Sequence, residues 1–213
     1  MMPEIYKFRI VYVLWSMLLG MTSFLISGAM ACSVIVLLDN YILATIIAGG
    51  IGGLLLGLFL RMRQKIIRMA IGGIIGMPIG LVMSFILVEG FGSLFPSIGA
   101  YFENSCIPDI IAIVLMGITF GAIFGSMIYG RKSIWLFSFV CGIASIPSGL
   151  LVGAMNSGYW IKAWLENLLE IFGEIDLNFL AIVISLGIGI GLSIGLYKYV
   201  PGKAPKNKTN VLV

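Results

Sequence analysis

YILATIIAGGIGGLLLGLFL, residues 41–60, runs directly into RMRQK, residues 61–65. The first segment carries no charge and reaches the length of about 20 residues that a helix needs to cross the core of a bilayer. The second segment is basic, and loops rich in lysine and arginine stay on the cytoplasmic side. Together they predict a membrane-spanning helix that ends at a cytoplasmic turn.

The composition of the whole chain is that of a protein embedded in lipid. Hydrophobic residues make up 60% of the 213 residues and charged residues only 10%, whereas a soluble domain carries about 25% charged residues. So little polar surface suits lipid better than water. We therefore expect one integral membrane domain, residues 1–213, with an all-α fold and the lipid bilayer as its main partner.

Six apolar stretches have spanning length, so the sequence predicts a polytopic bundle of six transmembrane helices. They cover residues 10–38, 41–60, 66–88, 110–129, 134–155 and 179–197. A secretory signal peptide is the alternative for the first stretch, because Ala29-Met30-Ala31 resembles a cleavage site. The apolar run continues to Leu38, beyond the roughly 7–15 residues of a signal-peptide core, which favours a retained helix.

Charge alternates between successive connections of this predicted bundle. The basic set is Lys7, Arg9, Arg61, Arg63, Lys65, Arg68, Arg131, Lys132, Lys198, Lys203, Lys206 and Lys208. The other connections hold Asp39, Glu89, Glu103, Asp109, Glu166, Glu170, Glu174 and Asp176, with Lys162 as their basic exception. Because basic segments stay inside, we expect both termini in the cytoplasm and the protein in the cell membrane.

The second and third stretches resemble the fourth and fifth. One offset aligns Gly52 with Gly121, Arg63 with Lys132, Gly73 with Gly142, Pro78 with Pro147, Gly80 with Gly149 and Leu81 with Leu150. The offset moves the pattern by two helices, so both copies keep one orientation and form a parallel repeat. We place repeat A at about 41–108, repeat B at about 109–177, helix six at 178–198 and a cytoplasmic tail at 199–213.

The connections on the acidic side contain two amphipathic segments. Apolar side chains follow one helical stripe within residues 159–172, and a weaker stripe lies within residues 93–104. A helix of this kind lies on the membrane surface. One or two outer interfacial helices are therefore predicted.

Glycine occurs 28 times, and much of it follows a four-residue spacing that places small residues on one face of a helix. The predicted helix-packing positions are Gly49, Gly53, Gly57, Gly72, Gly76, Gly80, Gly117, Gly121, Gly125, Gly149, Gly153, Gly187, Gly191 and Gly195. Such a face is a groove that a neighbouring backbone can enter, which is how helices associate in lipid. This pattern predicts glycine-zipper packing, within the chain or in a homo-oligomer.

Several kinds of chemistry have no support in the sequence. The chain has no histidine, and its three cysteines lack metal-ligand spacing. The glycine series lack the strand that precedes a nucleotide-binding loop. We therefore expect no enzyme, no metal, no cofactor and no nucleic-acid partner, although acidic residues leave the enzyme question open.

Two functions from different classes remain. The first is a transporter, or the membrane subunit of one, for a small neutral or weakly polar solute, with Pro78, Thr119, Ser145 and Pro147 as candidate path-lining residues. The second is a scaffold or assembly subunit that binds other membrane proteins through its glycine grooves. In size and helix count the chain resembles small six-helix transporters and the substrate-binding membrane subunits of vitamin-uptake systems, without a shared motif.

Overall fold

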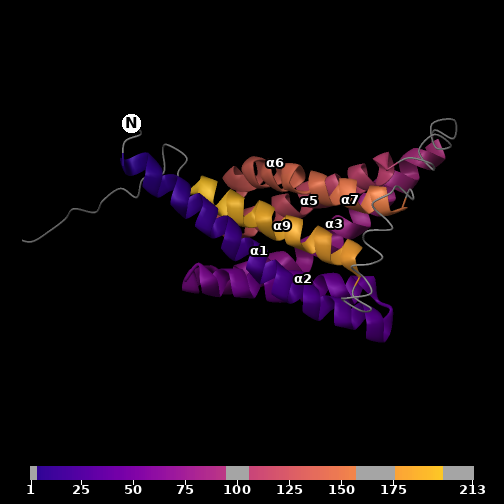
Figure 1. Ribbon diagram of the computed structural model, residues 1–213, viewed down its shortest axis with the longest axis horizontal. Helices are drawn as coiled ribbons and strands as arrows, with labels where there is room; N and C mark the ends of the chain where they lie inside the picture. Colours follow the sequence, from indigo (N-terminus) through magenta and orange to yellow (C-terminus); the bar gives the residue numbers. More distant parts are fainter. Residues whose placement is uncertain (1–3, 95–105, 157–175, 199–213) are drawn as a thin grey trace, which may run out of the picture.

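A computed structural model describes residues 4–94, 106–156 and 176–198, and every regular element in these ranges is helical (Figure 1). The α-helices are α1 (Glu4–Leu38), α2 (Tyr41–Phe59), α3 (Ile66–Leu94), α5 (Ile107–Tyr129), α6 (Ile134–Ala144), α7 (Ile146–Asn156) and α9 (Leu177–Tyr197). Two 3₁₀ turns, η1 (Arg63–Lys65) and η2 (Arg131–Ser133), precede α3 and α6. The predicted outer helices and the tail lie almost wholly outside the described residues.

Six helical spans in the described ranges are long and apolar enough to cross a membrane. They confirm the six predicted stretches, with α6 and α7 forming one span, Arg131–Asn156. Many of the large apolar side chains point outward, and Phe139 is 66% exposed. A soluble monomer rarely exposes apolar surface on this scale, whereas lipid solvates it.

Local side-chain chemistry decides where several helices begin and end. Asn40 caps α2, because its side chain accepts a hydrogen bond from the Leu43 N–H at 2.9 Å. Asp176 caps α9 in the same way, accepting from the Phe179 N–H at 3.0 Å. Each cap satisfies an N–H that the first helical turn leaves without a partner. At its C-terminal end α5 stops at Gly130, whose φ of 78° suits glycine.

The helices form a closed ring in which each packs against its neighbours in sequence. The last helix, α9, packs against both α1 and α6, which closes the ring. Figure 1 shows α9 lying between α1 on one side and α6 and α7 on the other. We call the contact between two neighbouring helices a seam.

Large apolar side chains fill the centre of this ring. Phe24 of α1 meets Phe120 of α5 edge to face, with ring centroids 6.0 Å apart. Phe124 lies beside Phe120 at 5.5 Å, and Met77 and Leu186 are fully buried in the same core. Among the described residues, the centre of the ring is therefore apolar and closely packed.

Backbones approach closely at several seams. An added Cβ on Gly49 of α2 would overlap the carbonyl oxygen of Gly73 on α3, and the reverse also holds. Between α1 and α9, a Cβ on Gly20 would overlap the carbonyl oxygen of Gly187. Only a residue without a side chain fits such a contact without moving a helix.

The aligned positions of the proposed repeat do not all keep equivalent neighbours. Gly73 and its aligned partner Gly142 both face the preceding helix. The aligned pair Gly52 and Gly121 differs, because Gly52 faces the preceding helix, α1, and Gly121 faces the following helix, α6. The prolines differ too, because α3 runs unbroken through Pro78 while α6 ends just before Pro147. The parallel repeat therefore stays a prediction.

These contacts predict the effect of adding one methyl group. Gly121→Ala places a Cβ against the Phe137 carbonyl oxygen, so it should lower stability by about 1–3 kcal/mol, as overpacking does. Gly90→Ala is the matched control: nothing lies within 4 Å of a Cβ there, and alanine in a helix gains up to about 1 kcal/mol over glycine. Thermal unfolding in detergent measures both, and equal melting temperatures for the two variants would contradict the close contact at Gly121.

Candidate functional site

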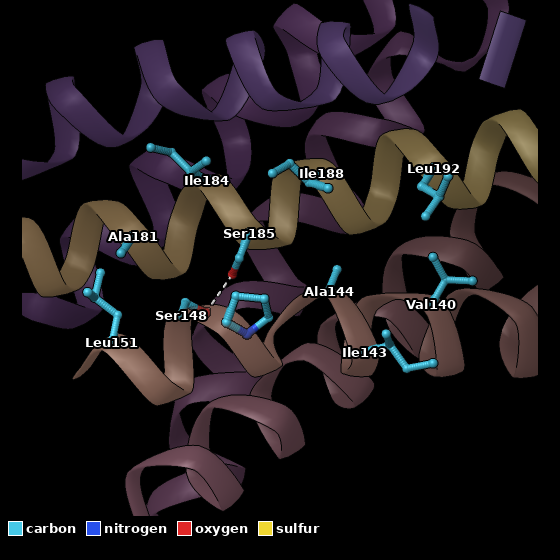
Figure 2. A pocket seen from close by; sticks show the side chains of 11 residues that line it. Val140, Ile143, Ala144, Ser148, Leu151, Ala181, Ile184, Ser185, Ile188 and Leu192 are labelled. Carbon is cyan, nitrogen blue, oxygen red and sulfur yellow. Dashed lines mark hydrogen bonds between the residues drawn. The ribbon is translucent and has the colours of Figure 1, made fainter. Parts of the chain in front are cut away.

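A groove runs between α6 and α7 on one side and α9 on the other, with a volume of about 640 Å³ (Figure 2). The side chains that line it are Val140, Ile143, Ala144, Pro147, Ser148, Leu151, Ala181, Ile184, Ser185, Ile188 and Leu192. Each helix contributes residues three or four positions apart, which places them on one face. We call this cavity the α9 groove.

A break separates α6 from α7 beside this groove. α6 ends at Ala144, and the Ser145 N–H still donates to the Cys141 carbonyl at 3.0 Å. Pro147 has no N–H to give the Ile143 carbonyl, and its ring crowds that carbonyl. The helical pattern resumes when the Gly149 N–H donates to the Ser145 carbonyl at 3.0 Å.

The seam along the α9 groove is packed differently from the others. Gly189 brings α9 close to α6, where an added Cβ would lie 2.9 Å from the Cys141 Cα. The lining of the groove itself contains no glycine, and branched side chains such as Ile184 and Ile188 form its wall. Branched side chains hold the backbones apart, so the walls of the groove stay separated.

A hydrogen bond between two serines crosses this seam. The Oγ atoms of Ser148 on α7 and Ser185 on α9 lie 2.8 Å apart, and both residues are buried (Figure 2). Each hydroxyl is also within hydrogen-bonding distance of a carbonyl in its own helix, Ser145 at 2.9 Å and Ile182 at 2.8 Å. A hydroxyl has one proton to donate, so one serine donates to the other while the second donates to the carbonyl of its own helix.

The chemistry of the groove is that of a neutral, mainly apolar site. No charged side chain lines it, and its polar side chains are Ser148 and Ser185. An ion would lose its solvation there without gaining a partner. The groove can therefore hold an apolar molecule that carries at most a group able to bond a hydroxyl.

The predicted path-lining residues are not gathered at one place. Pro147 lines the groove, whereas Ser145 is fully buried against α5, where a Cβ on Gly117 would overlap its Oγ. Pro78 lies within α3, and Thr119 is a half-buried residue of α5. Neither of these two residues, nor Ser145, lines the groove.

The predicted helix-packing glycines lie at several different seams. Gly49, Gly53 and Gly57 face α3; Gly72, Gly76 and Gly80 face α5; Gly117, Gly121 and Gly125 face α6 or Ser145; Gly149 and Gly153 face the start of α5; Gly187, Gly191 and Gly195 face α1. The sequence did not single out Gly20, which faces Gly187, or Ser185.

A sequence signal for the α9 side of the groove exists but is weak. Ala181, Ser185 and Ile188 form a stripe with helical spacing, but apolar stripes on a membrane helix face lipid as readily as a cavity.

Most other buried hydroxyls bond within their own helices, although Ser133 of η2 donates to the Gly125 carbonyl of α5 at 2.7 Å. Ser16 donates to the Val13 carbonyl at 2.9 Å, and Ser193 to the Gly189 carbonyl at 2.7 Å. Such bonds leave the hydroxyl little capacity to bind a solute. Within the described residues, no three metal-binding side chains gather.

A second hollow, of about 420 Å³, lies between α2 and α3. Its lining includes Val82, Phe85 and Glu89. Phe85 is 57% exposed here and Ile143 is 51% exposed in the α9 groove, so both hollows open to the outer surface of the bundle. The second hollow provides a comparison for the α9 groove.

The fold is that of a multi-pass α-helical membrane protein. No family model, no curated protein and no solved structure matches the chain. The particular function must therefore be inferred from the groove itself.

The serine contact predicts a weak coupling across the seam. In a double-mutant cycle with Ser148→Ala and Ser185→Ala, we expect a coupling free energy of about 0.6 kcal/mol, typical of interhelical hydrogen bonds in membranes. Ser148→Ala combined with Ser193→Ala is the control, and its effects should add, because the partners of Ser193 are Gly189 and Cys141 and not Ser148. Unfolding in mixed detergent measures each variant; a coupling of zero for the first pair would show that the contact carries no energy.

Proposed function

We propose that this protein binds a small neutral, mainly apolar molecule in the α9 groove and acts as its transporter or as the membrane subunit of one. The groove at the seam between α9 and α6–α7 is the observation that carries this proposal. Its volume of about 640 Å³ falls within the roughly 300–1,000 Å³ of small-molecule sites. Sites between the helices of a bundle are common places for such ligands.

The lining of the groove defines the chemistry of the guest. Branched apolar side chains supply contact area, and Ser148 and Ser185 supply one place for a hydroxyl or carbonyl group. A charged guest would be costly, since no lining side chain is charged. A neutral guest that dissolves in the bilayer can enter sideways from lipid.

A partner helix is the competing occupant, and it is less well suited to the groove. Helices in lipid associate through small residues that let backbones meet. The lining has alanines at 144 and 181, but bulky residues such as Leu151, Ile188 and Leu192 surround them, without glycine. These residues suit a flexible small molecule better than a second backbone. A scaffold role through other faces, and a homo-oligomer, stay predictions.

The proposed path follows the seam and avoids the centre of the ring. Phe24 and Phe120 fill that centre, so a solute passing there would have to displace both. Along the seam, the helix break before Pro147 gives α7 a hinge at Ser145. Movement of α7 at this hinge would widen the groove at the cost of the serine contact and of the close contacts of Gly149 and Gly153 with the start of α5.

Glycine-zipper packing would keep the other helices of the bundle rigid. We infer that the contacts at Gly49, Gly53, Gly187 and Gly191 keep the other seams closed while α7 moves. Close van der Waals contact is the main attraction available to helices in lipid. The seam with fewer such contacts would then open first.

Charge supports an orientation for the protein in a cell membrane. Both basic turns, η1 and η2, lie at the end of the bundle where α1 begins and α9 ends. Asp39, Glu89, Asp109 and Asp176 are the acidic side chains described at the opposite end. Basic segments remain in the cytoplasm, so we propose cytoplasmic N- and C-termini.

Photolabelling tests the proposed site. The purified protein in lipid nanodiscs is irradiated with a neutral alkanol that carries a diazirine, and adducts are located by peptide mass spectrometry. We expect labels on Leu151 and Ile188 in the groove to exceed those on Phe85 in the second hollow severalfold. Ala181→Trp should fill the groove and remove the first set only.

The matched control is Ile86→Trp, which changes the second hollow and should leave the labels in the groove unchanged. Equal labelling of Leu151 and Phe85, insensitive to Ala181→Trp, would show that the groove is ordinary lipid-facing surface. In that case the scaffold function would be the better proposal.

Thiol labelling tests the orientation. Cys106 is partly exposed at the start of α5, whereas Cys32 and Cys141 are buried. An impermeant maleimide applied to intact cells should therefore label Cys106 alone, and Cys106→Ser should abolish the signal. Labelling that appears only after the cells are lysed would reverse the proposed orientation.

A further inference from the structure

An aromatic cluster ties together the segments at one end of the bundle. The ring of Tyr129, at the end of α5, lies 4.3 Å from the ring of Tyr197 on α9 and 5.8 Å from that of Phe137 on α6, centroid to centroid. The Nζ of Lys65 in η1 lies 3.9 Å from the centroid of the Tyr129 ring. One tyrosine thus joins η1, α5, α6 and α9.

This clustering brings basic segments together that are far apart in the sequence. η1 and its flanks, η2 and the end of α9 each adjoin the Tyr129 cluster. The basic residues in or next to these turns and at the end of α9 are Arg61, Arg63, Lys65, Arg68, Arg131, Lys132 and Lys198, and we call the surface that they form the basic end. The arrangement makes one cationic surface from several turns.

The side chains of the basic end divide into two groups. Lys65 and Lys198 lie over aromatic rings, Tyr129 at 3.9 Å and Tyr12 at 4.1 Å. The arginines and Lys132 are exposed, as is Lys198. Asp39, Glu89, Asp109 and Asp176 lie at the other end of the bundle, whereas α1 begins at Glu4 at the basic end. Cations therefore outnumber acidic residues at the basic end, which leaves it positively charged.

Neighbouring apolar residues place the basic end at the surface of the bilayer. Trp135, the second residue after η2, is 86% exposed, and Ile67 beside Arg68 is 73% exposed. Exposed tryptophan is typical of the boundary between headgroups and lipid chains. Cations at this depth meet lipid phosphates before they meet any soluble anion.

We propose that the basic end binds the headgroup phosphates of anionic phospholipids. Arginine pairs with phosphate through two parallel N–H donors, and a basic site between spans on the cytoplasmic side is a known form of headgroup site. The contact of Lys65 with Tyr129 joins η1, which contains Arg63, to the end of α5, and Arg131 and Lys132 of η2 follow that end in the chain. The ligand is a membrane lipid, and this site is separate from the α9 groove.

The test compares lipids and charge-matched variants. The full-length protein in neutral detergent is titrated with phosphatidylglycerol or phosphatidylcholine of the same chain length, and bound lipids are counted by native mass spectrometry. We expect phosphatidylglycerol to bind preferentially, and Arg131→Gln with Lys132→Gln to weaken its binding about tenfold, since each basic residue near anionic lipid contributes substantially. Arg63→Gln with Arg68→Gln should do the same from the other turn.

The control changes the net charge equally at the opposite end. Asn40→Asp with Ser93→Asp adds two negative charges where the acidic residues lie, and aspartate still caps α2. This variant should bind phosphatidylglycerol like the unchanged protein. Equal weakening in all variants would show a net-charge effect and overturn the proposal, as would full displacement of the lipid by millimolar inorganic phosphate or by RNA. Melting temperatures without lipid verify that each variant is folded.

Discussion

Helices that are already in lipid gain little by hiding apolar surface from it, so they must be held together by contact at very short range. The approach of Gly49 to Gly73, where a single methyl group would overlap the opposing backbone, is a contact of this kind. Similar approaches join α1 to α9 through Gly20 and Gly187. The closed ring of helices depends on this constraint, because no other strong attraction acts between uncharged helices in a bilayer.

Where that contact is weaker, the fold has room for function. The seam between α9 and α6–α7 has a helix break at Ser145 and branched side chains along its walls, and it contains the larger groove. The centre of the ring is filled by Phe24 and Phe120 instead. A small-molecule ligand of this protein is therefore expected to bind at the side of the bundle, where it can exchange with the lipid.

The placement of polar side chains also follows from the need for close packing. Buried hydroxyls such as Ser16 and Ser193 bond to carbonyls of their own helices, so they pack like small residues. Ser148 and Ser185 differ because each also faces the other across a seam. Charges stay at the two ends, and at the basic end Tyr129 gathers them from separate turns. Apolar contacts therefore dominate the interior, and charged side chains dominate the surface at each end.

The sequence by itself determined the six spans and the separation of basic from acidic ends, because both follow from bilayer thickness and from charge along the chain. It also predicted that Pro147 would line a path, but it treated Pro78 as equivalent. Only the tertiary structure decided that α3 continues through Pro78, that Ser145 is buried against α5, and that Ser185 meets Ser148. The reason is rotational: a membrane helix is apolar on every side, so its sequence does not tell which face meets a neighbour and which meets lipid. That choice is made by the close fit of one backbone against another.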